Sequence, residues 1–237
     1  MTEPYRSQLI QMLSDLSIGI LKMLNDIRIN FSYYQSIVTE FETMTQELRK
    51  ERISQINTND LSVESLGDVL EASSVKILSL QAPVGRDLRM VLSSFRIIYD
   101  VKRISRDTSH SFAGLTSFIG KEAEAFKKQQ NLFMDSINAA SEMLDIFETI
   151  YRMEINETDY NFQKFIDKAE QLDDIIDDLF ENHSKVIIEG SNNGDFEIKS
   201  AHKLLSAIRA LERVGDHCTN IIESAIYIKS GVKVQIP

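Results

Sequence analysis

Proline and glycine are scarce along this chain. Its 237 residues include three prolines and nine glycines, and two of the prolines, Pro4 and Pro237, stand near or at the ends. Pro83 is therefore the single interior proline. A β-sandwich or a β-barrel needs frequent turns, which are rich in glycine and proline. The scarcity of both residues excludes these classes and predicts long helices.

Apolar residues recur at helical spacing in six stretches. They predict helices over residues 5–41, 50–80, 86–112 and 133–150, from a polar turn at 156–159 to 188, and over 196–229. We expect a stop at Pro83, a linker bracketed by Gly114 and Gly120, and a loop at residues 190–194. The polar run 57–60 either breaks the second helix or caps a new one.

Three helices, a linker and three more helices suggest an internal repeat. At an offset of 110, residues 101–106 lie on residues 211–216 with apolar, arginine and small positions in register. Only Arg103 and Arg213 are identical in this alignment. A repeat that keeps core positions while exchanging surface ones has this appearance.

The charge and cysteine content limit the partners and the compartment. Asp and Glu number 36 against 26 Lys and Arg, a net charge of −10 that disfavours nucleic acid. Cys218 is the single cysteine, so no internal disulfide forms. Charged residues interrupt the amino terminus, unlike a signal peptide, and no stretch reaches the ~18 apolar residues of a membrane span. We expect a cytoplasmic protein without a transmembrane segment.

Two pairs of acidic residues are spaced four apart, Asp173 with Asp177 and Glu212 with Asp216. At 3.6 residues per turn, each pair projects from one helix face. If the two helices pack antiparallel, the four carboxylates converge, and an all-oxygen set suits Mg²⁺, Mn²⁺, Ca²⁺ or oxidised iron. The alternative is a solvated face on which Glu212 pairs with neighbouring arginines such as Arg213.

Other chemistries find little support in the sequence. No histidine has a glutamate three residues before it, which leaves out a ferritin-like di-iron site. His217 points about 100° away from Asp216 on a helix, so we do not expect it to be a ligand. Cys218 occupies a packing position, and no phosphate-binding loop or nucleophile elbow occurs. We therefore expect no enzymatic activity.

Two motifs resemble those of the PhoU family, the regulators of phosphate uptake. QAPVGRDLR at residues 81–89 is similar to the family segment Gln-Pro-Val-Ala-x-Asp-Leu-Arg. LERVGDHCTNI at residues 211–221 is similar to Leu-Glu-Arg-Ile-Gly-Asp-His-Ala-x-Asn-Ile. The resemblance implies an all-α fold of two tandem three-helix bundles, residues 1–116 and 117–237, related by an internal repeat.

The resemblance also implies metal binding by carboxylate pairs on the second and third helices of each bundle. In the second bundle the matching residues are Asp173, Asp177, Glu212 and Asp216. The implied metal is Fe³⁺, Mn²⁺, Mg²⁺, Ca²⁺ or Zn²⁺, and the sequence does not choose among them.

The first bundle departs from this pattern. It keeps Glu64 and Asp68, but Lys102 and Arg106 stand where the second bundle has Glu212 and Asp216. Two cations facing two carboxylates neutralise each other, so we expect ion pairs and no metal in the first bundle.

The function implied by the resemblance is negative regulation of the phosphate-starvation response. Such a protein couples a phosphate ABC transporter at the inner membrane face to a sensor histidine kinase, and it is peripheral to the membrane through these partners. Family habit favours a homodimer. Two alternatives stay open: a PhoU-like metal-binding regulator of another transporter or of a stress response, and a carboxylate-bridged hydrolase or oxidase.

Arg86 and Arg89 form a short basic segment at the start of the helix after Pro83. The positive end of the helix dipole adds to their potential. They indicate either a contact with an acidic partner or a metal-bound anion, or a solvated turn.

Overall fold

The computed structural model describes residues 3–127, 130–154, 161–195 and 197–236. Every regular element within these ranges is an α-helix, which confirms the predicted all-α class. The helices are α1 (Glu3–Glu40), α2 (Gln46–Gln81), α3 (Gly85–Ile119), α4 (Ala123–Lys127), α5 (Gln130–Arg152), α6 (Gln163–Asn193) and α7 (Ile198–Ser230).

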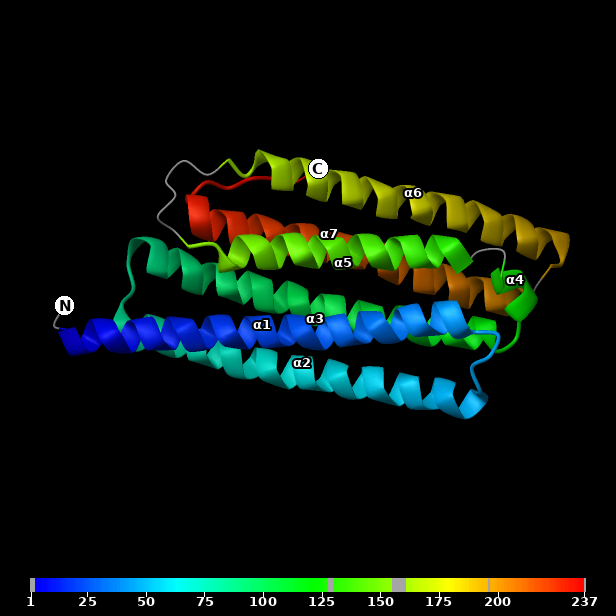
Figure 1. The fold of residues 1–237 in the computed structure, drawn as a ribbon, viewed down its shortest axis with the longest axis horizontal. Coiled ribbons are helices and arrows are strands. Elements are labelled where there is room, and N and C mark those ends of the chain that lie inside the picture. The colour runs from blue at the N-terminus through cyan, green and yellow to red at the C-terminus, as the bar shows by residue number, and fades with distance from the viewer. Residues whose placement is uncertain (1–2, 128–129, 155–160, 196, 237) are drawn as a thin grey trace.

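The six long helices lie side by side along the long axis of the molecule (Figure 1). Helices α1, α2 and α3 pack together as one three-helix bundle, and α5, α6 and α7 as the second. The most extensive contact joins α3 to α7, one helix from each bundle, and α1 also contacts α5. Helices α2 and α6 lie on the outside (Figure 1). The two bundles therefore share a broad interface.

One connected apolar core runs through both bundles. Helix α1 contributes buried side chains three or four residues apart, among them Leu13, Leu16 and Ile20. Phe126 of the short helix α4 contacts Phe41 and Phe133 at ring-centroid distances of 4.9 Å and 5.7 Å. Phe126 of α4 thus packs between the two bundles at the end of the core, where the chain passes from one bundle to the other.

Helix α2 is continuous through the polar run that made its boundary uncertain. Asn59 Nδ2 donates to Asn30 Oδ1 of α1 at 2.9 Å, and Asp60 accepts from Ser105 Oγ of α3 at 2.8 Å. The polar residues pair with neighbouring helices instead of capping a new one. The cap of α2 is Thr45, whose side chain accepts from the backbone of Leu48.

The predicted linker at Gly114 is wrong, because α3 continues through this residue to Ile119. A Cβ at Gly114 would lie 3.0 Å from both Ala207 Cβ and the carbonyl oxygen of Lys203. The absence of a side chain at Gly114 therefore allows α3 and α7 to pack closely. The sequence pattern does not distinguish a glycine used for packing from a glycine used for a turn.

The predicted loop at residues 190–194 is also wrong, since α6 continues to Asn193. Gly194 ends the helix with φ 79°, and Asp195 N donates to the carbonyl oxygen of Gly190 at 2.8 Å. This is the closure expected of a glycine just beyond a helix end. The turn predicted at 156–159 lies outside the described residues.

The stop at Pro83 is confirmed, with α2 ending at Gln81 and α3 beginning at Gly85. Ala82 adopts φ 42° and Gly85 adopts φ 57°. The left-handed conformation costs an alanine about 1 kcal/mol relative to glycine. Ala82 is therefore a strained position, and Gly85 an unstrained one.

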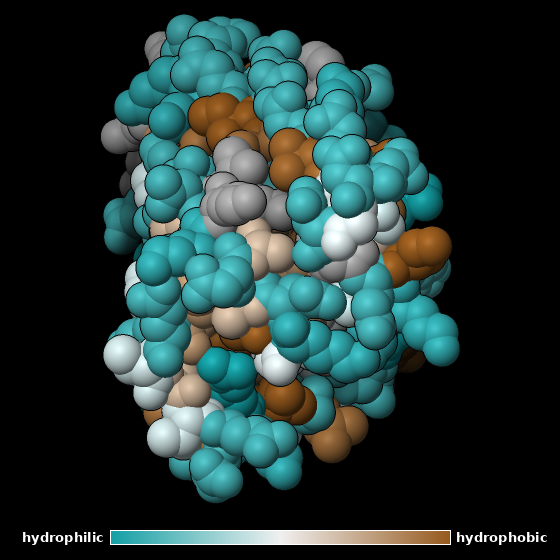
Figure 2. All heavy atoms as spheres, turned by 90° about the vertical axis from the view of Figure 1, so that its right-hand side faces the viewer, coloured by the Kyte–Doolittle hydropathy of each residue, from teal (hydrophilic) through white to brown (hydrophobic). Residues whose placement is uncertain are grey.

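The end of the molecule that carries α4 presents mainly hydrophilic side chains with small hydrophobic patches between them (Figure 2). None of the helices in the described ranges combines the length and the apolar character needed to cross a lipid bilayer.

We expect Ala82→Gly to stabilise the protein by about 0.5–1 kcal/mol, because glycine relieves the left-handed strain. Gly85→Ala should destabilise it by a similar amount, since no neighbouring atom lies within 4 Å and only the backbone conformation opposes a Cβ. Urea unfolding monitored by circular dichroism measures both. A loss of stability in Ala82→Gly would contradict the assignment.

Candidate metal centre

Helices α6 and α7 run antiparallel (Figure 1) and pack against each other. Asp173 and Asp177 lie on α6, and Glu212 and Asp216 lie on α7. Gly215 determines how close the helices come, because a Cβ there would lie 3.0 Å from Asp173 Oδ1. The Asp173 carboxylate thus rests on the backbone of α7. We call the four carboxylates the acidic seam.

Burial and mutual repulsion shape the electrostatics of the acidic seam. Burial raises the pKa of Asp173 to about 7, and the charges of Asp177, Asp216 and Glu212 add to the effect. The pKa values of Asp177 and Glu212 are raised as well, again first by burial and then by Asp216. Within the described ranges, none of the four carboxylates forms an ion pair. The acidic seam is therefore a group of carboxylates without ion-pair partners among the described residues, and only Arg209 and Arg213 nearby favour the charge of Glu212.

A hard cation fits the chemistry of this donor set, which consists of carboxylate oxygens alone. In the part of the chain that the structure describes, however, no three or more His, Cys, Asp or Glu side chains form a group that can hold a metal ion as they stand. The carboxylates face one another but do not form a finished coordination shell. Metal binding stays a prediction.

The equivalent position between α2 and α3 is occupied by basic side chains. Lys102 Nζ lies 2.7 Å from Asp68 Oδ1 and 3.0 Å from Glu64 Oε1, and Arg106 Nη2 lies 2.9 Å from Glu64 Oε2. The ion pairs that the sequence predicts are thus present. Burial disfavours the charge of Lys102, but its hydrogen bonds to Asp68 and Glu64 outweigh this effect and raise its pKa.

Two further features of this basic position escaped the sequence interpretation. Glu71 Oε1 lies 3.7 Å from Lys102 Nζ, one helical turn beyond Asp68. A Cβ at Gly67 would lie 2.8 Å from Lys102 Cδ, so glycine makes room for the lysine stem. The spacing of Glu64, Asp68 and Glu71 on one helix face was the signal that could have found the third carboxylate.

The side of α7 that faces α3 carries a second polar group. Arg213 binds Asp107 through two contacts, Nη2 to Oδ1 at 2.6 Å and Nε to Oδ2 at 3.2 Å. His217 Nδ1 lies 2.8 Å from Asp100 Oδ1. Of the two arginines near Glu212 in the sequence, Arg209 and Arg213, the second is therefore engaged with the other bundle.

Sequence reasoning missed the two buried acids, Asp100 and Asp107. They are seven residues apart, so they lie on the same face of α3, and both are buried. An acidic residue at a core position requires a buried partner, which was the available signal. His217 turns away from the acidic seam, as its place after Asp216 predicts, and Cys218 is buried with its thiol pKa raised by that burial.

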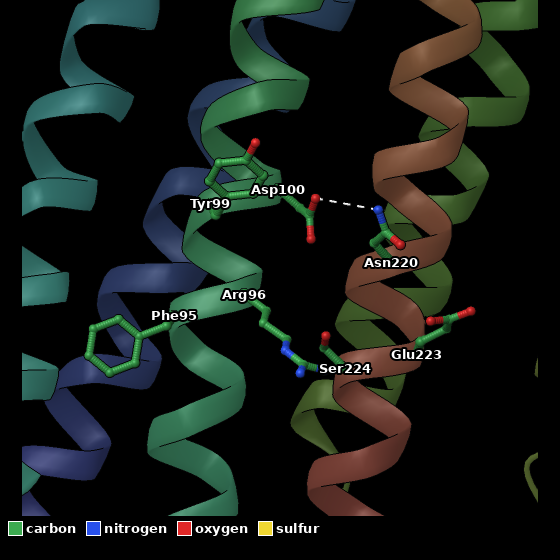
Figure 3. Close-up of a pocket in the computed structure, with 7 residues that line it drawn as sticks. All are labelled: Phe95, Arg96, Tyr99, Asp100, Asn220, Glu223 and Ser224. Atoms are coloured by element: carbon green, nitrogen blue, oxygen red, sulfur yellow. Dashed lines mark hydrogen bonds between the residues drawn. The ribbon is translucent and has the colours of Figure 1, made fainter. Parts of the chain in front are cut away.

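A cavity of about 360 Å³ adjoins this polar group between α3 and α7. Figure 3 shows Arg96 and Tyr99 projecting from α3 and Asn220 and Ser224 from α7. Asn220 Nδ2 lies 3.4 Å from Asp100 Oδ1, the contact drawn as a dashed line. The polar contacts between the bundles thus extend to a solvent-accessible opening.

Comparison with known proteins places the fold. Residues 140–225 match the family model of the PhoU domain. The chain resembles the solved PhoU from Pseudomonas aeruginosa with a TM-score of 0.75 and 19% identity, over 94% of this chain and 99% of that one. It resembles the PhoU regulatory protein of the phosphate transport system from Streptococcus pneumoniae with a TM-score of 0.70 and 21% identity, over 96% and 99%.

Curated relatives agree with the structural neighbours. A phosphate-specific transport system accessory protein PhoU homolog from Thermotoga maritima is 24% identical over 197 residues, which cover 82% of this chain and 78% of the relative. A PhoU homolog from Deinococcus radiodurans is 27% identical over 184 residues, covering 77% and 81%.

The protein is thus all-α, with two three-helix bundles packed against each other, and the second bundle carries the acidic seam. Residues 140–225 match the PhoU domain, and the curated relatives and solved structures that the chain resembles are PhoU proteins. The matched residues all lie in the second bundle, whereas the first bundle, with its basic residues Lys102 and Arg106, lies outside them.

We expect the metal-free protein to lose stability as the pH rises from about 4 to about 7. In the folded protein Asp173 has a pKa of about 7, against an ordinary value of 3.8. The contribution of its proton to the free energy of unfolding is therefore fully present below pH 3.8 and is lost as the pH rises to about 7. Asp173→Asn should reduce this fall and be more stable at pH 8 by about 1–2 kcal/mol, allowing for partial exposure.

Urea unfolding at a series of pH values, with a chelator present, measures the effect. Asp195→Asn is the matched control, since this exposed aspartate lies beyond the end of α6. An unchanged pH profile in Asp173→Asn would show that Asp173 ionises normally.

Proposed function

We propose that this protein is a negative regulator of phosphate uptake and of the phosphate-starvation response. It acts in the cytoplasm, as a homodimer, by binding a phosphate ABC transporter and a sensor histidine kinase. The names of its relatives, which are phosphate-specific transport system accessory proteins, support the link to phosphate transport. A bundle regulates by binding one state of a partner more tightly than another, and this requires no catalytic group.

The observation that carries the metal part of the proposal is the unpaired charge of the acidic seam. Asp173 and Asp177 from α6, with Glu212 and Asp216 from α7, would hold the cation. A bound cation supplies the positive charge that these carboxylates lack, which removes their mutual repulsion and holds α6 against α7. Lys102 provides the same compensation permanently between α2 and α3. Metal availability would therefore alter one face of the molecule and leave the other unchanged.

We expect one metal-binding bundle per chain. Equilibrium dialysis against Mn²⁺, Mg²⁺, Ca²⁺, Zn²⁺ and Fe³⁺, followed by metal analysis, measures the stoichiometry. The double variant Asp173→Asn with Asp216→Asn should lose the bound metal, because it removes two of the four carboxylates. The matched control, Glu64→Gln with Asp68→Asn, makes the same kind of change in the first bundle and should retain it.

Equal metal binding by both double variants would refute a site at the acidic seam. Circular dichroism verifies that each variant is folded. The reciprocal variant, Lys102→Glu with Arg106→Asp, adds two carboxylates to Glu64, Asp68 and Glu71 and removes both cations, so it should increase the bound metal if charge composition alone separates the two positions.

The regulatory role predicts a phenotype for deletion of the gene. In phosphate-rich medium, the deletion strain should show uncontrolled phosphate uptake and raised phosphatase expression. The wild-type gene should restore control, and a gene encoding Asp173→Asn with Asp216→Asn should restore it less well than one encoding Glu64→Gln with Asp68→Asn. Phosphate uptake and phosphatase activity are the measurements.

Two results separate this proposal from its alternatives. Normal phosphate uptake and phosphatase expression in the deletion strain would direct the search to another transporter or to a stress response. Full restoration by the acidic-seam variant would retain the regulatory role but remove metal from it.

A further inference from the structure

A second, larger cavity lies at the end of the molecule opposite α4. It has a volume of about 640 Å³ and is bounded by the amino-terminal half of α1, the start of α3, the last residues of α5 and the end of α7. Figure 1 shows these four segments meeting at the end that carries the amino terminus. The volume is within the range of small-molecule sites.

One wall of this cavity is a stripe along α1. Ile10, Leu13, Ile18 and Leu21 line it, with Ser14 and Ser17 between them. These positions follow helical spacing over twelve residues, so the wall is about 17 Å long. Ile10 is 59% exposed and Ile18 is 62% exposed, which leaves apolar surface in contact with water. A long, narrow apolar ligand fits such a wall better than a compact polar one.

Basic side chains close the cavity near the ends of α3 and α7. Arg86, Arg152 and Lys229 line it, together with the acidic residues Asp87 and Glu154. Arg152 is already paired, because its Nε lies 2.7 Å from Glu148 Oε1. Among the described residues, Arg86 has no carboxylate within ion-pair distance. Arg86 and Lys229 are therefore the cations of the cavity that no carboxylate pairs at ion-pair distance among the described residues, with Asp87 and Glu154 further along its lining.

Arg86 is close enough to Lys229 to disfavour its charge. Burial, and then the charge of Arg86, lowers the pKa of Lys229 to about 8. Burial also lowers the pKa of Arg86, and Asp87 opposes this effect only in part. Lys229 Nζ donates to the carbonyl oxygen of Met153 at 2.7 Å, which holds it at the cavity without neutralising it. An anion between the two cations would relieve this repulsion.

We propose that this cavity binds a single-chain anionic amphiphile of the fatty-acid type. Its carboxylate lies between Arg86 and Lys229, and its hydrocarbon chain lies along the α1 stripe against Ile10, Leu13 and Ile18. The proposal goes beyond the regulatory role and uses neither the acidic seam nor any metal. It makes the end of the molecule a sensor for an amphiphilic small molecule.

Isothermal titration calorimetry of the full chain tests the proposal with octanoate, octan-1-ol and acetate as probes. Octanoate should bind at least about tenfold more tightly than octan-1-ol, which lacks the charge, and than acetate, which lacks the chain. Equal affinity for acetate would overturn the role of the α1 stripe, and equal affinity for octan-1-ol would overturn the role of the basic pair.

Variants locate the site. Lys229→Met and Arg86→Gln should each weaken octanoate about tenfold, and Ile18→Asp should weaken it by placing a charge on the apolar wall. Lys50→Met is the matched control, since Lys50 is an exposed lysine near the start of α2 at the other end of the molecule, and its octanoate affinity should not change.

Circular dichroism and the thermal midpoint of each variant separate a lost site from a lost fold. Unchanged octanoate affinity in folded Lys229→Met and Arg86→Gln would overturn the location. Binding to vesicles of anionic phospholipid without measurable binding of octanoate would also overturn the proposal, because it would assign these residues to a membrane surface.

Discussion

The contact between α3 and α7 is the interaction on which the rest of the structure depends. It joins one helix from each bundle, and it buries two aspartates, Asp100 and Asp107. A buried carboxylate without a partner costs several kcal/mol, so Arg213 and His217 on the opposite helix are required by the burial itself. Because each acid and its partner come from different bundles, the pairing also fixes how the bundles sit against each other.

Carboxylates gather at two helix contacts, between α2 and α3 and between α6 and α7, and their charge is balanced differently at each. Between α2 and α3, Lys102 lies among three carboxylates and its stem crosses α2 over Gly67. Between α6 and α7, Gly215 allows an equally close approach, but the side chain that fills the space is Asp173, itself a carboxylate. The contact between α2 and α3 contains its own positive charge, that of Lys102. The contact between α6 and α7 has no such cation among the described residues, and burial together with the repulsion of neighbouring carboxylates raises the pKa of Asp173.

The sequence was sufficient for the fold class, the helix order and the ion pairs of Lys102 and Arg106. The fold class and the helix order follow from hydrophobic periodicity, whereas the ion pairs follow from the family resemblance, which places Lys102 and Arg106 opposite Glu64 and Asp68. The sequence was insufficient to place helix ends where glycine occurs both in loops and in packed helices. Gly114 serves helix packing and Gly190 is a buried helical residue, yet both carry the signature of a loop. The pairing of Arg213 with Asp107 was equally hidden, because it joins residues 106 positions apart that only the packing of α3 against α7 brings together.

Helix α7 belongs to two surfaces at once. Within two turns, Glu212 and Asp216 face α6, whereas Arg213 and His217 face α3. A helix of this kind is stiff over such a short distance, so it moves as a single rod. Any force that pulls the carboxylates toward α6 must twist or shift the rod against the salt bridge on its other side. An ion bound at the acidic seam would thereby exert a force on the contact between α3 and α7 at the centre of the molecule.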